Sequence, residues 1–334
     1  MRPMATMTDI AREAGVSLST VSYALSGKRT ISASTRERIE AAIARLEYHP
    51  AASARALAKG RTSLLGVAVP RHEDVDDHVI MEFVGSILEA AHEADDDVLL
   101  VAAEDHARTL KVVEEGKVDA LVVMDLVEDD PRLPALARLH RPVVLIGYPQ
   151  DAAGIACVDF DFLSGAMLAV RELSLRGARR IALLTPHRDP EGPVPTYARR
   201  AGLGFEMGCR ELGLPAPRLE VDAEPEAIAA LVAEHLSGPD AVDALVVHHE
   251  RALPHLTRAL AAAGVDVPGA LQLVAIAPDD VAAAGAHSSI ELPIPAIGRT
   301  AVTMALELVE DPSAPPHSRL LSPTFVPRET TRDR

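Results

Sequence analysis

The chain has 334 residues, of which 48% are hydrophobic and 25% are charged. These values are ordinary for a folded globular protein, and the length is sufficient for two or three compact units. The two cysteines, Cys157 and Cys209, are too few for a disulfide framework and indicate a reducing compartment. The first residues lack the apolar run of a signal peptide, and no apolar stretch approaches the length of a membrane-spanning helix. We therefore expect a cytoplasmic protein that makes no contact with a membrane.

The net charge of −16 argues against a nucleic-acid partner, but the charge is unevenly distributed. Residues 1–62 contain ten basic and five acidic side chains, so this segment carries +5 and the remainder of the chain carries −21. A small basic segment on a large acidic body is typical of a protein with a DNA-binding module. Short N-terminal segments are also basic by chance, so charge alone leaves both interpretations open.

The first 50 residues contain three short helical patterns separated by turn signals. Thr6 predicts the N-cap of the first helix, and Gly15 predicts its end because glycine adopts the left-handed conformation at low cost. Ser17 predicts the N-cap of a second helix, and the capping box at residues 34–37 predicts the start of a third. Two helices joined by a tight turn that contains glycine are typical of a helix-turn-helix unit.

The second predicted helix combines an apolar anchor with small polar side chains. Val21 is expected to face the core of the head, which leaves the hydroxyl groups of the helix free to reach phosphates and base edges. The alternative is that serines near a helix start act only as caps. The hydroxyl-bearing side chains are Ser17, Ser19, Thr20, Ser22 and Tyr23.

These motifs resemble the lactose repressor family (LacI/GalR type) of bacterial regulators. The matching runs are Thr6-Met7-Thr8-Asp9-Ile10-Ala11, Ala14-Gly15-Val16-Ser17, Thr20-Val21-Ser22, Ser34-Thr35-Arg36, and Leu46 with Tyr48-His49-Pro50. The resemblance implies that the second helix enters the major groove of an operator, with base-reading positions at Leu18, Ser19 and Tyr23. It also implies phosphate-contacting positions at Thr6, Ser17 and Ser22, and Thr20 is included in the predicted DNA-binding set.

An alanine-rich stretch between Pro50 and Gly60 predicts a short helix, because proline favours helix starts and glycine favours helix ends. A plain linker helix is the alternative interpretation. The family resemblance implies a hinge over residues 50–61 that contacts the DNA minor groove through Leu57, with Ala54 and Arg55 beside it. Ala51 departs from the polar residue common in the family, which puts one phosphate contact in doubt.

From Thr62 onward, short apolar runs alternate with helical patterns, such as a helical stretch around residues 79–94. This alternation predicts parallel βαβ units. The expected strands are residues 64–70, 98–101, 120–123, 143–146, 181–184, 244–247 and 271–275. We therefore expect an N-terminal three-helix helix-turn-helix head and an α/β periplasmic-binding-protein-like core of two doubly wound lobes.

The resemblance also implies the domain boundaries. The expected division is a head over residues 1–49, the hinge, and an effector-binding and dimerisation core over residues 62–334. The two lobes of the core are expected to exchange strands. Lobe one is expected to combine about residues 63–160 with 292–321, and lobe two about residues 161–291 with 322–334.

The expected effector site lies between the lobes, at the carboxyl ends of the strands. Here the chain departs from the family pattern, because Phe162 follows Asp161 where sugar-binding members commonly have asparagine. Sugar-binding members also commonly have an arginine three residues before a Gly-Phe pair. Alignment on Gly204-Phe205 places Ala201 at that position, alignment on Gly202 places Arg199 there, and both alignments remain open. The predicted effector-binding residues are Asp161, Phe162, Arg199, Arg200, Glu250 and Asp279. The loss of several amides and carboxylates puts a simple sugar effector in doubt.

Motifs for other chemistry are weak. The chain has no Gly-x-Ser-x-Gly nucleophile elbow and no P-loop. The run His248-His249-Glu250 suggests a metal site, but adjacent residues on the strand expected there point to opposite faces and cannot easily share one ion. We predict no metal, no cofactor and no catalytic residue.

The sequence therefore predicts a sequence-specific DNA-binding transcriptional regulator, a repressor that binds a pseudo-palindromic operator as a homodimer. Two heads on a two-fold axis bury enough surface for specific binding, whereas one head does not. A small-molecule effector, a sugar or another metabolite, is expected between the core lobes. The alternative is a sugar-type binding or sensing protein without direct DNA regulation, and the head and the missing signal peptide count against it. An enzyme is the third option.

Overall fold

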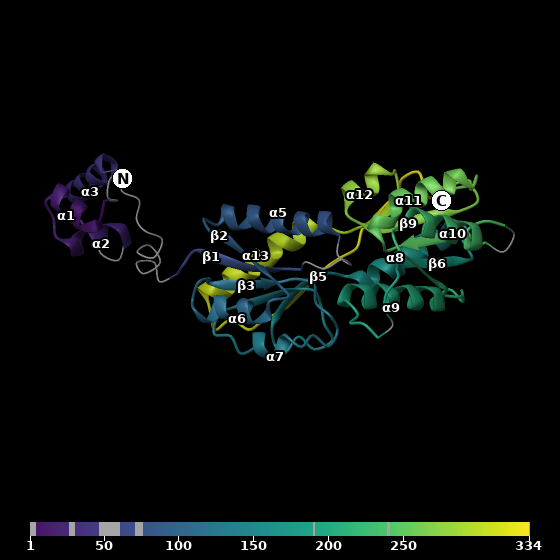
Figure 1. Cartoon of the computed structure of the whole chain (residues 1–334), viewed down its shortest axis with the longest axis horizontal. Helices are drawn as coiled ribbons and strands as arrows, with labels where there is room; N and C mark the ends of the chain where they lie inside the picture. Colours follow the sequence, from purple (N-terminus) through teal and green to yellow (C-terminus); the bar gives the residue numbers. More distant parts are fainter. Residues whose placement is uncertain are drawn as a thin grey trace.

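The computed structural model describes residues 5–26, 31–46, 61–70, 76–189, 191–238 and 241–333 (Figure 1). The predicted hinge helix falls almost entirely on residues 50–60, so that helix, Ala54, Arg55 and Leu57 lie outside the described residues. Among the residues that are described, no helix is long and apolar enough to cross a membrane.

The N-terminal head contains three helices, α1 (Met7–Ala14), α2 (Leu18–Ser26) and α3 (Ala33–Arg45). The predicted caps of the first two helices are confirmed. Thr6 and Asp9 form a reciprocal capping box at α1, and Gly15 ends that helix with a φ of 63°. The predicted start of α3 is wrong by two residues, because the Ser32 side chain accepts a hydrogen bond from the backbone N–H of Thr35 and caps the helix earlier.

Side chains from all three helices form the small apolar core of the head. The buried members are Ile10, Ala11, Ala14, Val21, Ile39 and Ala42. This cluster is small, and each of its side chains contributes a large share of the buried apolar surface.

The core of the chain contains two six-stranded sheets. The first sheet has the order β11-β5-β4-β3-β1-β2 and its strands are all parallel. Its strands are β1 (Leu64–Val69), β2 (Asp97–Ala102), β3 (Ala120–Val123), β4 (Val143–Ile146), β5 (Ala156–Phe160) and β11 (Ser318–Leu321). We call this sheet and the helices packed on it the first lobe.

The second sheet has the order β12-β10-β9-β8-β6-β7, and its pairs are parallel except for the antiparallel pair of β10 with β12. Its strands are β6 (Ile181–Pro186), β7 (Arg218–Val221), β8 (Ala244–Val247), β9 (Gln272–Ala277), β10 (Ser288–Glu291) and β12 (Phe325–Val326). We call this sheet and its helices the second lobe. The predicted apolar runs all fall on strands, whereas β7 and β10 had no such run to reveal them.

Helices cover both faces of the first sheet (Figure 1). Its helices are α5 (Asp77–Glu93) and α13 (Ile294–Glu310) on one face, and α6 (His106–Glu114) and α7 (Leu133–Leu136) on the other. Alternating strand residues supply the two cores, so Val67 packs toward α5 and α13 while Ala68 packs toward α6 and α7. This period of two follows from the strand geometry.

The second sheet is covered in the same way. Its helices are α8 (Phe162–Leu175) and α9 (Thr196–Glu211) on one face, α10 (Pro225–His235) and α11 (Leu253–Ala262) on the other, with the short α12 (Asp279–Ala284) and the 3-10 helix η1 (Glu250–Ala252). The chain crosses between the lobes from β5 to α8, from β10 to α13 and from β11 to β12. The predicted fold class, a three-helix head with a doubly wound two-lobed core, is therefore confirmed.

Candidate nucleic-acid interface and effector cleft

Helix α2 of the head has one buried face and one polar, exposed face. Val21 is 0% exposed in the core of the head, whereas Leu18 is 49% exposed and Tyr23 is 37% exposed. Ser19 and Ser22 are exposed beside them. The helix therefore presents an apolar group, two hydroxyls and a phenol to the outside, and these groups suit contacts with phosphates and base edges.

Some of the predicted DNA-contacting hydroxyl groups also hold the head together. The Ser17 side chain accepts a hydrogen bond from the backbone N–H of Thr20 at 3.1 Å, and its hydroxyl lies 2.7 Å from that of Thr20. The Thr6 hydroxyl donates to the Asp9 carboxylate at 2.7 Å. Thr6 and Ser17 therefore act as helix caps, and the Thr20 hydroxyl is bonded to the Ser17 cap, whereas DNA contact by these residues stays a prediction.

Two of the basic side chains of the head are paired with acids. Arg12 lies 3.1 Å from the Asp9 carboxylate, and Arg45 lies 2.6 Å from the Glu13 carboxylate. Both pairs are exposed, so they contribute little to folding stability and leave the arginines able to exchange partners.

The two lobes are in contact at two places, and we call the region between these contacts the cleft. On one side the backbone N–H of Thr196 donates to the Leu126 carbonyl at 2.9 Å, and the N–H of Glu128 donates to the Val194 carbonyl at 3.2 Å. On the other side His78 of α5 contacts Asp280 of α12. The carboxyl ends of β5, β6, β8 and β9 reach the cleft between these contacts, as expected for doubly wound sheets.

A cluster of rings lies in the cleft, centred on Phe162 at the start of α8. Phe162 is 5% exposed, and its ring centroid lies 5.8 Å from that of Tyr197 and 5.4 Å from that of His248. Tyr197 and His248 also contact each other at 5.6 Å, edge to face. Burial lowers the pKa of His248 to about 3, so this imidazole is neutral and cannot act as a cationic partner.

Asp161 and Arg200 lie together beside the ring cluster. An Arg200 guanidinium nitrogen lies 3.5 Å from the Asp161 carboxylate, and the guanidinium carbon lies 5.0 Å from the ring centroid of Tyr148. Asp161 also caps α8, since it accepts hydrogen bonds from the backbone N–H of Ser164 at 3.2 Å and from its hydroxyl at 2.6 Å. Much of the hydrogen-bonding capacity of Asp161 is thus used within the chain.

Asp159 was not predicted and is the most unusual charged group of the cleft. It is buried, and burial raises its pKa to about 7, while the nearby Arg200 lowers the pKa and Asp161 raises it. Its Oδ1 accepts from the backbone N–H of Phe160 at 2.8 Å. Among the described residues, its Oδ2 and the Nε of Arg200 have no hydrogen-bond partner. A buried carboxylate with an unsatisfied oxygen is costly for folding and is common at binding sites.

Arg199 and Glu250 face the cleft from the second lobe. The Nε of Arg199 lies 3.7 Å from the carboxylate of Glu128 in the first lobe. Burial raises the pKa of Glu250 to about 7, and the Asp76 carboxylate of the first lobe acts in the same direction. Both residues therefore interact electrostatically with acidic groups of the first lobe.

The expectation that His248, His249 and Glu250 lie on a strand is wrong. Strand β8 ends at Val247, His248 and His249 connect it to η1, and Glu250 is the first residue of η1. The strand argument against a shared metal ion therefore does not apply to them. In the structure His248 instead packs on Phe162, as described above.

Asp279 has a different role from the other predicted effector residues. Its carboxylate accepts a hydrogen bond from Arg328, which also donates to the His287 carbonyl at 3.0 Å and to the Ser289 hydroxyl at 2.9 Å. The structure thus brings Asp161, Phe162 and Arg200 together and ties Asp279 to the C-terminal segment. Tyr197 and Asp159 carried no sequence signal, and His248 was considered only as part of a metal motif, because the cluster forms only when residues of both lobes pack together.

Comparison with known families matches two parts of the chain. Residues 6–51 match the family described as "Bacterial regulatory proteins, lacI family", and residues 170–331 match "Periplasmic binding protein-like domain". The HTH-type transcriptional regulator RafR of Escherichia coli is 31% identical over 267 residues, which cover 71% of this chain and 80% of that protein.

Solved structures share this fold over most of the chain. A lac repressor dimer bound to operator and the anti-inducer ONPF superposes with a TM-score of 0.82 at 24% identity, covering 98% of this chain and 99% of that chain. A complex of the transcriptional regulator CelR with cellobiose gives a TM-score of 0.67 at 22% identity, with the same two coverages of 98% and 99%.

Proposed function

The chain belongs to the lacI family of bacterial regulatory proteins, and from this premise we propose how its own residues act as a DNA-binding transcriptional regulator. Its relatives are HTH-type transcriptional regulators, and its fold is that of the lac repressor. The proposal is a repressor that binds a pseudo-palindromic operator in double-stranded DNA. The observation that carries it is the exposed face of α2, opposite the buried Val21.

In this proposal α2 enters the major groove of the operator. Leu18, Ser19 and Tyr23 read base edges, with Leu18 suited to the methyl group of thymine because it cannot form a hydrogen bond. Thr6, Ser17, Thr20 and Ser22 face the phosphates, which orient the head on the duplex. We keep Ala54, Arg55 and Leu57 as predicted minor-groove contacts of the hinge, although they lie outside the described residues. The proposed division of the chain remains residues 1–49, 50–61 and 62–334.

The regulator is proposed to act as a homodimer, as in the lac repressor dimer bound to operator. Helix α5 supports this, because Met81 is 61% exposed and Leu88 is 53% exposed on its outer surface. Residues seven apart lie on one side of a helix, so these two side chains form an apolar stripe that a second copy of the chain can cover. Two heads then read two half-sites.

We propose that a small-molecule effector, a sugar or another metabolite, binds between the lobes. One support is that polar atoms of Asp159 and Arg200 lack hydrogen-bond partners among the described residues. A second is that Arg199 and Glu250 interact with acidic groups of the opposite lobe. A ligand held by both lobes shifts their relative position, and through the head it shifts operator affinity. The structural relative CelR was solved with cellobiose.

The proposed function is binding, without a catalytic step. The proposed location is the cytoplasm, where the operator DNA is. The alternative, a sugar-type binding protein without DNA regulation, leaves the head without a role. A mobility-shift assay separates the two functions. The full-length protein is titrated against the DNA upstream of its own gene and against a shuffled duplex of the same length and composition.

We expect retardation of the upstream DNA that survives an excess of the shuffled duplex. Specific binding is commonly about 10³-fold or more tighter than non-specific binding at the same salt concentration. Equal affinity for both duplexes would contradict the proposed function.

A further inference from the structure

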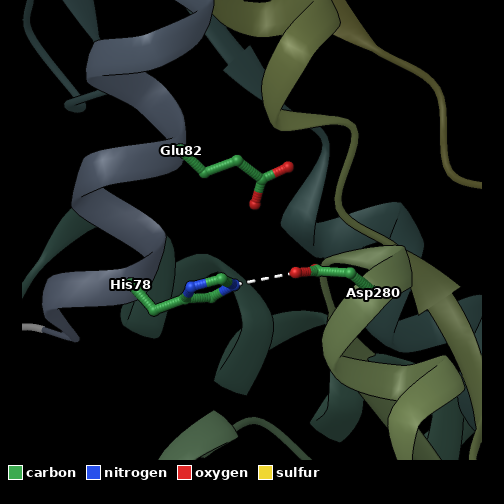
Figure 2. Close-up of side chains that lie close together, drawn as sticks. All are labelled: His78, Glu82 and Asp280. Atoms are coloured by element: carbon green, nitrogen blue, oxygen red, sulfur yellow. Dashed lines mark hydrogen bonds and ion pairs between the residues drawn. The ribbon is translucent and has the colours of Figure 1, made fainter.

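A cluster of three metal-ligating side chains lies at the second contact between the lobes, apart from the ring cluster of the cleft. The cluster consists of His78 and Glu82 of α5 and Asp280 of α12. Figure 2 shows the imidazole and the two carboxylates pointing toward one another from the two helices. One ligand atom from each residue lies within 4.8 Å of the others, and His78 Nε2 lies 2.8 Å from Asp280 Oδ2.

The local structure holds these groups in place. His78 and Glu82 are four residues apart, so they lie on the same side of α5. The Asp76 side chain caps the helix and accepts from the backbone N–H of His78 at 2.8 Å, which orients the first turn. Asp280 sits in the first turn of α12 on the opposite lobe. Two ligands are therefore supplied by helix α5 of the first lobe, and the third is supplied by α12 of the second lobe.

The electrostatic environment favours a cation. The carboxylates of Asp280, Glu82 and Asp76 lie around His78, so acidic groups outnumber basic ones in this cluster. Within the described part of the chain, the Oε2 of Glu82 is shielded from solvent and has no hydrogen-bond partner. His78 and Asp280 are each 58% exposed, so an ion can reach the cluster from solvent.

We propose that His78, Glu82 and Asp280 form a binding site for a first-row divalent transition-metal ion, which bridges the two lobes. One imidazole with two carboxylates suits zinc or manganese. In a tetrahedral zinc site the ligand atoms lie about 2.1 Å from the ion and therefore about 3.4 Å from one another. The present spacing reaches that geometry through small side-chain movements, with water in the open position.

The site has a structural consequence. Because its ligands come from both lobes, the ion binds most tightly at one relative position of the lobes and stabilises that position. The bound ion replaces a single hydrogen bond between α5 and α12 with coordination by both helices.

Calorimetric titration of the full-length, untagged, EDTA-treated protein with zinc sulfate tests the site, with manganese chloride as a second probe. We expect one ion per chain. His78→Ala, Glu82→Gln and Asp280→Asn are each expected to weaken binding by at least about 10-fold, since even the loss of a group that only orients a ligand commonly has that effect. His92→Ala and Glu89→Gln are matched controls, because they change the same residue types on exposed positions of the same helix and should bind as the wild type does.

Saturating zinc should also raise the melting temperature of the wild type by about 3 °C or more, and the same zinc concentration should raise that of Asp280→Asn by clearly less. Absence of stoichiometric binding, or equal binding by the wild type and the three ligand variants, would overturn the site. The measurement needs no DNA, so it is independent of operator binding.

Discussion

Helix α2 and the interlobe cleft form their surfaces in different ways. The groups exposed by α2 belong to one run of nine residues, and the helical period alone separates Val21 from Leu18 and Tyr23. The cleft is assembled from α8, α9, the turn after β8 and parts of the first lobe. A surface built on one helix follows from local sequence, whereas a surface built from several segments depends on how the sheets pack.

The two regions also differ in the size of the core that supports them. Among its described residues, the head rests on six buried apolar side chains, whereas the lobes share much larger clusters. The head is therefore expected to be sensitive to single substitutions that the lobes would tolerate.

The largest effect is expected from Val21→Asp. This change buries a carboxylate without a partner in the small core of the head, which costs several kcal/mol and unfolds that unit. Operator affinity should fall by more than about 10³-fold, to the level of non-specific binding or below it, as measured by mobility shift. The thermal transition of the lobes serves as the control and should not move. Wild-type operator affinity in this variant would contradict the role given to the head.

The next effect concerns salt. The segment of residues 1–62 carries +5 and the remaining chain −21, so contacts between the head and phosphates should dominate operator binding. Raising the salt concentration from about 50 to about 200 mM should weaken operator binding on the order of 10³-fold, because counterions compete for the phosphates. Titrations by fluorescence anisotropy at several salt concentrations measure the slope. An operator affinity that does not change with salt concentration would contradict phosphate contacts by the head.

A smaller effect is expected from Asp159→Asn in the cleft. The raised pKa of Asp159, about 7 against an ordinary 3.8, means that the folded chain binds this proton more tightly than the unfolded chain does. Its contribution to stability is therefore full below about pH 4 and is lost as the pH rises through about 7. Asparagine mimics the protonated form, so the variant should gain on the order of 2 to 4 kcal/mol at pH 8.

Chemical denaturation of the wild type and Asp159→Asn across pH 5 to 8 measures this difference. The gain should shrink toward pH 5, where the wild-type group is already protonated in the folded chain. A gain that is the same at both ends of the range would show that Asp159 does not titrate between them.

Substitution on the exposed face of α2 should alter recognition with little effect on stability. Leu18→Ala and Tyr23→Ala remove partly exposed side chains, so the free energy of unfolding should fall by no more than about 1 kcal/mol. Operator affinity should fall by about 10- to 100-fold, with little change for the shuffled duplex. Leu175→Ala, an equally exposed leucine of α8, is the matched control and should bind operator normally. A loss of equal size on both duplexes would argue against base reading by these residues.

The smallest effect is expected from free glucose and galactose, which should leave the melting temperature within about 1 °C at millimolar concentration. Phe162 occupies the position where an amide is expected, and Asp161 is already engaged with Ser164 and Arg200. Differential scanning fluorimetry measures the shift. A clear rise with either sugar would show that the remaining polar groups of the cleft form an ordinary sugar site.

The sequence by itself determined the head, the strand runs of both lobes and the family. Local signals such as the Thr6 cap, the Gly15 turn and the apolar runs act within a few residues, so they can be recognised in order along the chain. The short strands β7 and β10 lacked such a run. The exposed edge strand β7 and the serine-rich β10 take their place from their neighbours, not from their own apolarity.

Only the tertiary structure decided the composition of the cleft. It brought Tyr197, His248 and Asp159 to the predicted Asp161, Phe162 and Arg200, and it assigned Asp279 to Arg328 instead. It also placed Asp280 beside His78, 202 residues earlier in the chain. Contacts of this kind depend on which strands are neighbours in a sheet and on how the two sheets face each other. No local periodicity encodes that arrangement, because it results from the burial of apolar surface over the whole chain.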